Sequence, residues 1–296
     1  MRRLERAYQA FFRRVKAGEK AGYPRFRSRR RYDSLTWDSA WSIRERRLAL
    51  PGIGHLKVKW HRELPPSAKV CAVTVRRVAG RWYASFALAL PAPRVPHRPL
   101  GPAVGVDLGI QNFAALSTGE LIPGPRAYRA ASRKLRAAQR RVSRRIKGSL
   151  RRQKARLLLA RLNERIRNLR QNHAHQLSRR LTSDFGLIAV EDLQVRGLTR
   201  GFLAKDINDQ GWAEFLRLVG YKAEDAGIQL VRVPPRGTSQ ACSSCGTLVP
   251  KPLSGRTHQC PHCGLVVDRD INAARNILRL GLSRQATTWP TGACVA

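Results

Sequence analysis

The chain has 296 residues, and 57 lysines and arginines against 19 aspartates and glutamates give it a formal net charge of +38 at pH 7. Its hydrophobic content of 43% is sufficient for a buried core, and its length excludes a small domain held together by disulfides. Only 11 of the cationic residues are lysines, which leaves 46 arginines, and the planar arginine side chain suits bidentate contact with phosphate. We therefore expect a polyphosphate partner.

The sequence contains neither an export signal nor a membrane segment. No stretch approaches the roughly 18 consecutive apolar residues that a membrane helix needs, and the first 20 residues lack the apolar centre of a signal peptide. Four of the six cysteines form two CxxC pairs, which in a reducing compartment indicates metal binding rather than disulfides. These features predict a cytoplasmic protein that does not associate with a membrane.

The N-terminal third of the chain is predicted to hold a helix and a β module. Residues 1–33 carry apolar and aromatic positions at helical spacing, followed by the basic run RFRSRRR. Residues 34–95 consist of short β-prone runs, including a hairpin in VRRVAGRWYAS, and predict a partial β-barrel or sheet. Five prolines between residues 91 and 102 then mark a domain boundary.

Tryptophans in this β module have two interpretations. They are Trp37, Trp41, Trp60 and Trp82, and each lies near arginine or lysine. Next to such cations an indole can stack on a nucleic-acid base, but aromatic side chains are more often part of a core. We expect the core for at least two of them.

The remainder of the chain alternates strands and helices. Buried-strand patterns and helical periodicity predict the order β-β-(β)-α-β-α-β-insert-α, which makes this region an α/β domain over residues 103–281. Residues 282–296 are predicted to form a tail. The predicted strands lie at 103–109, in FAALST, at 185–193 and in IQLVRVP, and the last two helices at 208–226 and 270–280.

A long, strongly basic helical pair is predicted at residues 126–182. It carries 20 arginines or lysines and one acid, Glu164. An isolated charge run is usually a solvated face, but so many cations repel one another without a polyanion, so we favour a surface that follows a nucleic-acid backbone. The arginines expected to contact phosphates, including one that precedes the cysteine pairs, are Arg133, Arg136, Arg140, Arg144, Arg151, Arg152 and Arg236.

The cysteine pairs predict a structural zinc site within residues 238–266. CSSC at Cys242 and Cys245 and CPHC at Cys260 and Cys263 supply four thiolates, the tetrahedral set that structural zinc prefers. Such a site has no open position and would stabilise the fold rather than catalyse. His258 and His262 are alternative ligands, although we expect exposed histidines. Cys71 is expected to be a buried strand residue.

Acidic residues are rare and occupy informative positions. Asp107 and Glu191 each stand at the carboxyl end of a predicted strand, while Asp268 and Asp270 open the last helix. Carboxylates from strand ends and a following helix can converge at one edge of an α/β sheet, where they would hold Mg²⁺ ions for phosphoryl transfer. Taken singly, each acid has a structural alternative: Asp107 could cap a turn, Glu191 could pair with an arginine, and Asp270 could be the N-cap of the last helix.

Five motifs in order resemble the TnpB/OrfB proteins of bacterial insertion sequences. They are GVDLG at 105–109, VEDL at 190–193, RGTSQACSSCG at 236–246, CPHCG at 260–264 and DRDINAARNIL at 268–278. The GYPRFRSRRRYDSLTW segment also resembles that family's entry into its β-barrel wedge domain. The similarity runs from about residue 1 to 281.

The resemblance implies an RNA-guided DNA endonuclease with an RNase H-like RuvC domain, related to compact type V CRISPR effectors. Asp107, Glu191 and Asp270 would be the three catalytic carboxylates and would hold Mg²⁺, with Asp268 ranked below Asp270. Guide RNA made from the transposon end and double-stranded target DNA would be the partners. The protein would then be associated with the nucleoid of a prokaryote.

One departure from the family pattern lies near the start. Family members usually have several dozen more residues before GYPRF, which form the first barrel strand and a helical recognition lobe, so residues 1–33 are interpreted as a remnant of that lobe. The alternative function is therefore a guide-RNA-dependent DNA-binding protein that does not cut. A strand-transfer transposase is disfavoured because no HUH-type histidine pair stands near a nucleophilic tyrosine.

Overall fold

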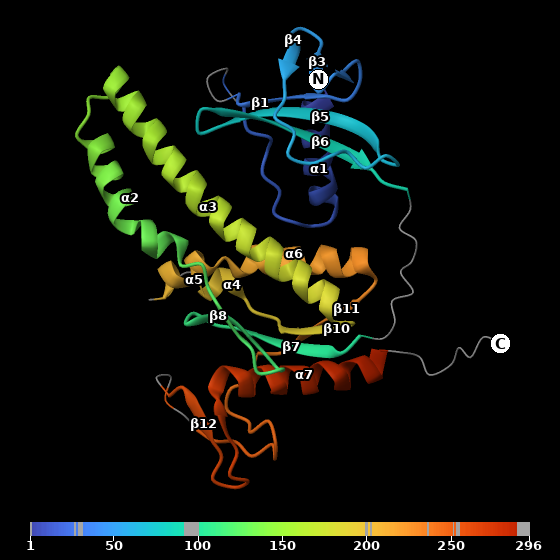
Figure 1. Cartoon of the computed structure of the whole chain (residues 1–296), viewed down its shortest axis with the longest axis vertical. Helices are drawn as coiled ribbons and strands as arrows, with labels where there is room; N and C mark the ends of the chain where they lie inside the picture. The colour runs from blue at the N-terminus through green and yellow to red at the C-terminus, as the bar shows by residue number, and fades with distance from the viewer. Residues whose placement is uncertain are drawn as a thin grey trace, which may run out of the picture. The chain divides into compact units, whose positions relative to one another are not determined.

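The computed structural model describes residues 2–26, 28, 32–91, 101–198, 201, 203–235, 237–250, 252 and 255–288. The chain divides into two compact units, Met1–Pro91 and Ala92–Ala296. Each unit is described by itself, with the elements labelled as in Figure 1. Within the described residues no helix combines the length and the apolar character that crossing a membrane requires.

Over its described residues, the first unit contains one helix and two three-stranded antiparallel sheets. Buried side chains of both sheets share a core around Leu48 and Val73. The predicted hairpin is confirmed: Val78 pairs with Arg81 across a two-residue turn. The helix is α1 (Arg2–Lys16); one sheet holds β1 (Ser34–Trp37), β5 (Lys69–Val78) and β6 (Arg81–Ala89), and the other β2 (Ser42–Arg44), β3 (Arg47–Leu50) and β4 (Gly54–Lys57).

The second unit is built on a five-stranded mixed sheet with the order β11-β10-β7-β8-β9. β10 runs parallel to both β7 and β11, whereas β8 and β9 are antiparallel to their neighbours. The α/β class predicted for this region is therefore confirmed. The strands are β7 (Ala103–Leu108), β8 (Asn112–Leu116), β9 (Leu121–Pro123), β10 (Leu187–Glu191) and β11 (Gln229–Val233).

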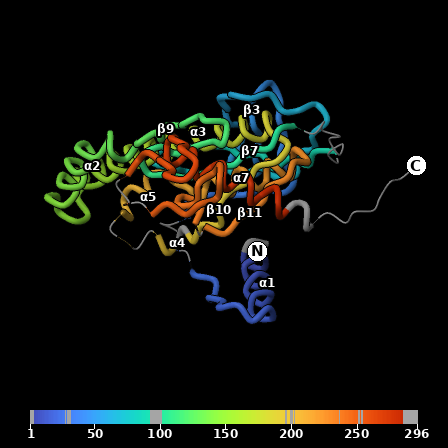
Figure 2. The backbone as a smooth tube through the Cα atoms, turned by 90° about the horizontal axis from the view of Figure 1, so that it is seen from below, coloured from blue at the N-terminus to red at the C-terminus, as the bar shows by residue number. Residues whose placement is uncertain are grey.

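Helices cover both faces of this sheet: α3 and α6 lie on one face and α7 on the other (Figures 1 and 2). Val104 and Ile188 point into the core on the first face, while Leu187 and Ala189 pack with Ile277 of α7. The helices are α2 (Ala127–Ser143), α3 (Leu150–Asp184), α4 (Val195–Leu198), α5 (Ala204–Gln210), α6 (Trp212–Ala226) and α7 (Arg269–Thr288), and a small hairpin of β12 (Thr257–Gln259) and β13 (Val266–Asp268) precedes α7.

Glycine permits the close approach of α7 to the sheet. A Cβ atom at Gly105 of β7 would collide with the backbone carbonyl of Ala274 and with Leu278, and one at Gly281 would collide with Ala189. Because neither glycine has a side chain, the helix lies directly on the two central strands. The first turn of α7 is thereby held beside the carboxyl end of β7, where Asp270 lies near Gly109.

Several local expectations are wrong. The last helix continues to Thr288, past the predicted start of the tail at residue 282. His258 is fully buried in β12, where an exposed histidine was expected, and Cys71 of β5 is exposed. His173 of α3 packs its ring edge-on against Phe113 of β8 at 4.8 Å, and burial lowers its pKa.

Candidate active site and metal centre

Two acids stand side by side at the carboxyl ends of the central parallel strands. Val190 of β10 pairs with Val106 of β7, and the next residues along the two strands are Glu191 and Asp107. Side chains alternate along a strand, so Asp107 shares a face with Gly105, and Glu191 shares one with Ala189. That face is the one covered by α7. The register therefore puts both carboxylates on the face of the sheet that α7 covers.

The third acid comes from the first turn of α7. Asp270 is 7% exposed, and its Oδ2 lies 3.7 Å from the position that a Cβ would take at Gly109, just after β7. The helix cap is its neighbour: Asp268 Oδ1 accepts hydrogen bonds from the backbone N–H groups of Asp270 and Ile271, at 2.8 and 3.3 Å. Asp268 is thus the N-cap of α7, a role that was predicted as an alternative for Asp270. The Asp270 carboxylate does not cap the helix.

Electrostatics confirm that these acids are neighbours. Burial, followed by the nearby charges of Glu191 and Asp270, raises the pKa of Asp107 to about 8, against a model-compound value of 3.8. Burial also raises the pKa of Glu191, opposed by a hydrogen bond from Thr238. Burial is thus the leading cause of both shifts, and the charges of neighbouring acids add to it at Asp107.

The carboxylates also have protein partners. Thr238 donates its hydroxyl hydrogen to Oε1 of Glu191 at 2.5 Å, while Asp270 accepts from Arg269 Nε at 3.3 Å and lies 3.8 Å from Arg256 Nη1. Among the described residues, the cysteines form the set of side chains already gathered as metal ligands, and the acids do not converge as tightly. The structure thus brings the predicted acids close to one another, but their oxygen atoms do not form a cluster as tight as that of the cysteine sulfur atoms.

The four predicted cysteines meet in one cluster. Their sulfur atoms all lie within 4.8 Å of one another, and the pairs Cys242–Cys263 and Cys245–Cys260 are 3.6 Å apart. These separations are too long for disulfide bonds and close to the roughly 3.8 Å expected between thiolates placed tetrahedrally around zinc. Hydrogen bonds with Thr247 lower the pKa of Cys245, which favours its thiolate, whereas the pKa of Cys263 in the same cluster is raised.

Each cysteine pair sits on the same kind of turn. The carbonyl of Cys242 accepts from the Gly246 N–H and that of Cys260 from the Gly264 N–H, both at 3.0 Å. Both glycines have positive φ values, 79° and 75°, which only glycine adopts without strain. The two CxxCG motifs therefore fold as equivalent knuckles that face each other.

Sequence reasoning missed the polar side chains that connect the cysteine segment to α7. Asn272 accepts from the Ser243 N–H and donates to the Ala241 carbonyl, at 2.8 and 2.7 Å. Asn276 donates to the carbonyls of Thr238 and Ala241 at 2.9 and 2.7 Å. Both asparagines are buried. Their spacing of four residues on one helix face was the available signal.

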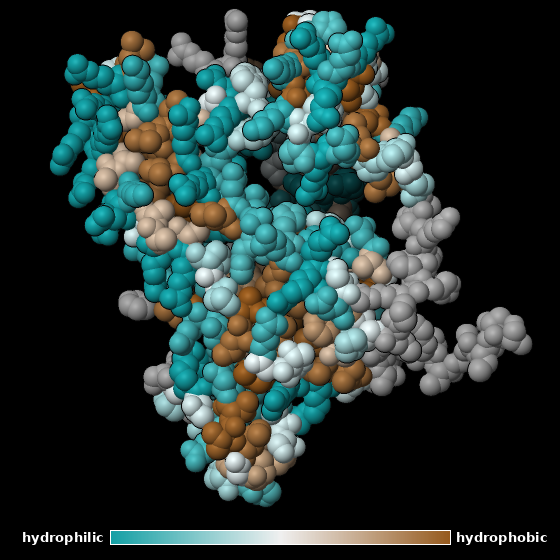
Figure 3. Space-filling view, in the orientation of Figure 1, coloured by the Kyte–Doolittle hydropathy of each residue, from teal (hydrophilic) through white to brown (hydrophobic). Residues whose placement is uncertain are grey.

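The basic helical pair is an antiparallel hairpin of α2 and α3, and Figure 3 shows hydrophilic residues around a band of hydrophobic ones over it. Arg140 and Arg144 line a hollow of about 580 Å³ with Arg141 and Arg145. Arg152 makes a hydrogen bond within the hairpin: its Nη1 donates to the Arg145 carbonyl at 2.9 Å. The remaining predicted arginines of the hairpin, Arg133, Arg136 and Arg151, are exposed, while Arg236 lies outside the described residues.

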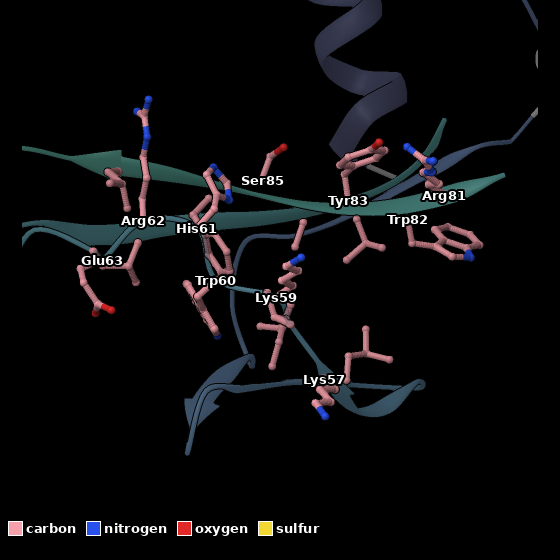
Figure 4. A pocket seen from close by; sticks show the side chains of 18 of the residues that line it. Lys57, Lys59, Trp60, His61, Arg62, Glu63, Arg81, Trp82, Tyr83 and Ser85 are labelled. Carbon is pink, nitrogen blue, oxygen red and sulfur yellow. The ribbon is translucent and has the colours of Figure 1, made fainter. Parts of the chain in front are cut away.

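The first unit has a cavity of about 850 Å³ beside β6 (Figure 4). Trp60 stacks on Phe86 in its wall, with ring centroids 5.2 Å apart, and Trp82 is 64% exposed. Trp37 and Trp41 pack against the core, as expected for at least two of the four tryptophans. Trp82 therefore keeps an accessible ring in a wall that also holds Lys and Arg side chains.

Comparison with protein families gives two adjacent matches. The family model OrfB of IS605, described as "Probable transposase", matches residues 88–201. A second model, described as "Cas12f1-like, TNB domain", matches residues 212–277. The first covers the β7–α3–β10 region, which carries Asp107 and Glu191, and the second covers the cysteine segment and Asp270.

Individual relatives extend the similarity over nearly the whole chain. It is 39% identical over 295 residues to the "Putative RNA-guided DNA endonuclease" of Streptomyces pristinaespiralis, covering 97% of this chain and 71% of that protein. It is 31% identical over 297 residues to the "Putative RNA-guided DNA endonuclease InsQ" of Escherichia coli K12, covering 94% and 72%.

A solved structure is similar in fold. The protein in the cryo-EM structure of a Cas12f1-sgRNA-target DNA complex superposes with a TM-score of 0.51 at 19% sequence identity. The match covers 71% of this chain and 45% of that one, so this chain spans less than half of that protein's length.

Proposed function

Because the chain belongs to the TnpB/OrfB family of transposon-encoded proteins, we propose that it is an RNA-guided DNA endonuclease that hydrolyses target DNA at Asp107, Glu191 and Asp270. The observation that carries the proposal is the register of β7 and β10, by which two carboxylates lie side by side at the ends of paired strands, on the face covered by α7. Relatives named as RNA-guided DNA endonucleases match nearly the entire chain.

The fold supports the same proposal. Three antiparallel strands followed by two parallel ones, with the first strand in the centre, is the sheet order expected for an RNase H-like RuvC domain, and the chain has this order over β7 to β11. We assign residues 103–281 to that domain, with the basic hairpin at 126–182 and a zinc ribbon at 238–266 as insertions. Residues 34–95 are assigned to a wedge domain, and residues 1–33 to the helix and basic loop that precede it.

The acidic residues fit Mg²⁺ by their chemistry. They offer hard carboxylate oxygens, and burial together with the nearby Glu191 and Asp270 destabilises the anionic form of Asp107. Glu191 and Asp270 would share the metal with Asp107. When bound, Mg²⁺ would neutralise charge on the phosphodiester and lower the pKa of water for in-line attack.

The chain's own residues supply positioning. Gly105 lets α7 approach the sheet, and this approach holds Asp270 near the two strand acids. Arg256 and Arg269, beside Asp270, would attract a DNA phosphate to this edge of the sheet. The exposed arginines of the α2–α3 hairpin would neutralise the backbone of guide RNA or target DNA, while base pairing with the guide selects the sequence.

The cysteine cluster fits structural zinc. Four thiolates within 4.8 Å leave no open ligand position, so a metal there would hold the two knuckles together and take no part in hydrolysis. Its role in this proposal is to fix the segment between β11 and α7. That segment borders the acidic site.

The test is cleavage by protein loaded with its guide RNA, with target DNA and Mg²⁺. We expect cleavage by the wild type and its loss in Asp107→Ala, with guide binding retained. Asp192→Asn is the matched control, because this exposed acid follows Glu191 and pairs with Arg232 at 3.2 Å. Binding of target DNA without cleavage by the wild type would instead support the guide-dependent DNA-binding protein.

A further inference from the structure

A buried hydroxyl group holds one carboxylate of the proposed active site. Thr238 is 4% exposed, and its Oγ1 donates to Glu191 Oε1 at 2.5 Å. The two residues belong to different segments, 47 positions apart in the chain. Glu191 stands at the end of a strand, where its side chain has rotational freedom that this bond removes.

The position of Thr238 is itself fixed from α7. Asn276 donates to the Thr238 carbonyl at 2.9 Å and, with Asn272, to the carbonyl of Ala241. These asparagines are 2% and 0% exposed, and four residues apart on a helix they face the same way. Asp270 lies in the first turn of that helix. One helix therefore supplies the third acid and, through Asn276 and Thr238, holds the second.

The same segment begins the cysteine cluster. Ala241 directly precedes Cys242, and the Ser243 N–H between the first two cysteines donates to Asn272 at 2.8 Å. The segment from Thr238 to Ser243 is therefore hydrogen-bonded to Glu191 through the Thr238 hydroxyl at one end, and it carries Cys242 of the cysteine cluster near the other. A shift of the knuckle would move the hydroxyl that holds Glu191.

We propose that Thr238 is a positioning residue for Glu191, and that Asn272 and Asn276 couple its placement to the cysteine cluster. The inference rests on the proposed function, because it assigns Glu191 to a metal site. A hydrogen bond to one carboxylate oxygen leaves the other available and fixes the direction in which it points. Partners of this kind change metal affinity 10- to 100-fold when they are lost.

The primary test measures binding of Mn²⁺ alone to the zinc-loaded full chain, by electron paramagnetic resonance of the free ion. Thr238→Val keeps the shape of the side chain and removes the hydroxyl, and we expect it to weaken Mn²⁺ binding about tenfold. Thr238→Ser restores a hydroxyl and should recover most of the affinity. In cleavage, Thr238→Val should lower kcat and leave KM for DNA unchanged.

Thr182→Val is the matched control, because Thr182 is also buried but donates to carbonyls of its own helix, α3. It should bind Mn²⁺ as the wild type does. Asn276→Ala should weaken Mn²⁺ binding while retaining one zinc per chain, which separates lost positioning from lost folding. Unchanged Mn²⁺ affinity in both Thr238→Val and Asn276→Ala would overturn the inference.

The two proposals fail differently. If Glu191→Gln abolishes Mn²⁺ binding and cleavage but Thr238→Val changes neither, the active site stands and the positioning role is refuted. If the wild type neither binds Mn²⁺ nor cleaves, both are refuted.

Discussion

Arg170 of α3 donates two hydrogen bonds to Oδ1 of Asp209 on α5, at 3.0 and 2.7 Å. Asp209 also accepts from the backbone N–H groups of Tyr128 and Arg129, in the first turn of α2. The N-cap residue of α2, Arg126, makes no capping hydrogen bond with its own side chain. One buried carboxylate therefore joins three helices and fixes the base of the basic hairpin.

Replacement of Asp209 should consequently destabilise the second unit. Asp209→Ala leaves the Arg170 guanidinium unpaired and α2 uncapped, and we expect the free energy of unfolding to fall by about 3 kcal/mol. Urea denaturation followed by circular dichroism measures it. The control is Asp206→Ala, which removes an exposed ion pair with Arg129 and should cost less than about 1 kcal/mol. Equal losses in the two variants would contradict the role of Asp209.

A second prediction concerns the contact between α7 and the sheet. Gly105→Ala would force a methyl group against the Ala274 carbonyl, and such overpacking should cost about 1–3 kcal/mol of unfolding free energy. Since the contact places Asp270 near Asp107, cleavage should fall as well. Gly220→Ala on α6 is the control: its nearest neighbour would be Leu230 at 3.9 Å, and helix propensity favours alanine. A thermal shift assay that finds Gly105→Ala as stable as Gly220→Ala would refute this reasoning.

Much of this architecture was predictable because the local signals agree with the tertiary ones. Asp107 and Glu191 end short apolar runs, and apolar runs in an α/β order become adjacent parallel strands, so their proximity followed from the pattern. Paired CxxC motifs likewise predicted the cysteine cluster. In both cases the site residues belong to a pattern that is visible in the sequence: an apolar run for the two acids and the CxxC spacing for the cysteines.

The contacts that complete the site carry no such signal. Thr238 and Asn276 are ordinary polar residues, and only the three-dimensional path of the chain brings their partners to them. His258 was expected to be exposed because it neighbours the knuckles, yet its position in β12 turns it inward. Nor does the sequence show that Arg152, predicted to contact phosphate, also donates a hydrogen bond to the Arg145 carbonyl at the turn between α2 and α3.

The pKa of Asp107 predicts how stability depends on pH in the absence of divalent metal. Burial and the neighbouring Glu191 raise this pKa to about 8 from an unfolded value of 3.8. The protonated form therefore favours folding, and this contribution is complete below about pH 4 and lost as the pH rises through about 8. We expect Asp107→Asn to gain stability relative to the wild type over this range.

The test is to measure the melting temperatures of the wild type and of Asp107→Asn at several pH values, in a buffer without added Mg²⁺. The difference between Asp107→Asn and the wild type should widen from about pH 4 to 8, and adding Mg²⁺ should narrow it, because a cation offsets the repulsion. A difference that stays constant with pH would show that the carboxyl group does not titrate in this range.

Loss of the metal that we propose for the cysteine cluster should loosen the segment between β11 and α7. Cys245→Ser should reduce zinc content below one ion per chain, measured by release to a colorimetric chelator, and lower the melting temperature. Cys71→Ser is the control, since this exposed cysteine lies on β5 of the first unit and is not one of the four clustered cysteines. Full zinc content in Cys245→Ser would rule out the four-thiolate site.

The basic hairpin should control the salt dependence of nucleic-acid binding. For the wild type, affinity should fall steeply between about 50 and 200 mM salt, because bound arginines release counterions from phosphates. The variant Arg136→Gln/Arg140→Gln/Arg144→Gln should reduce the magnitude of the slope of log K against log salt by about 2 to 3, measured by fluorescence anisotropy with guide RNA. Arg152→Gln should leave the slope unchanged because its guanidinium is bonded to the Arg145 carbonyl. Identical slopes for the triple variant and the wild type would place the nucleic-acid surface elsewhere.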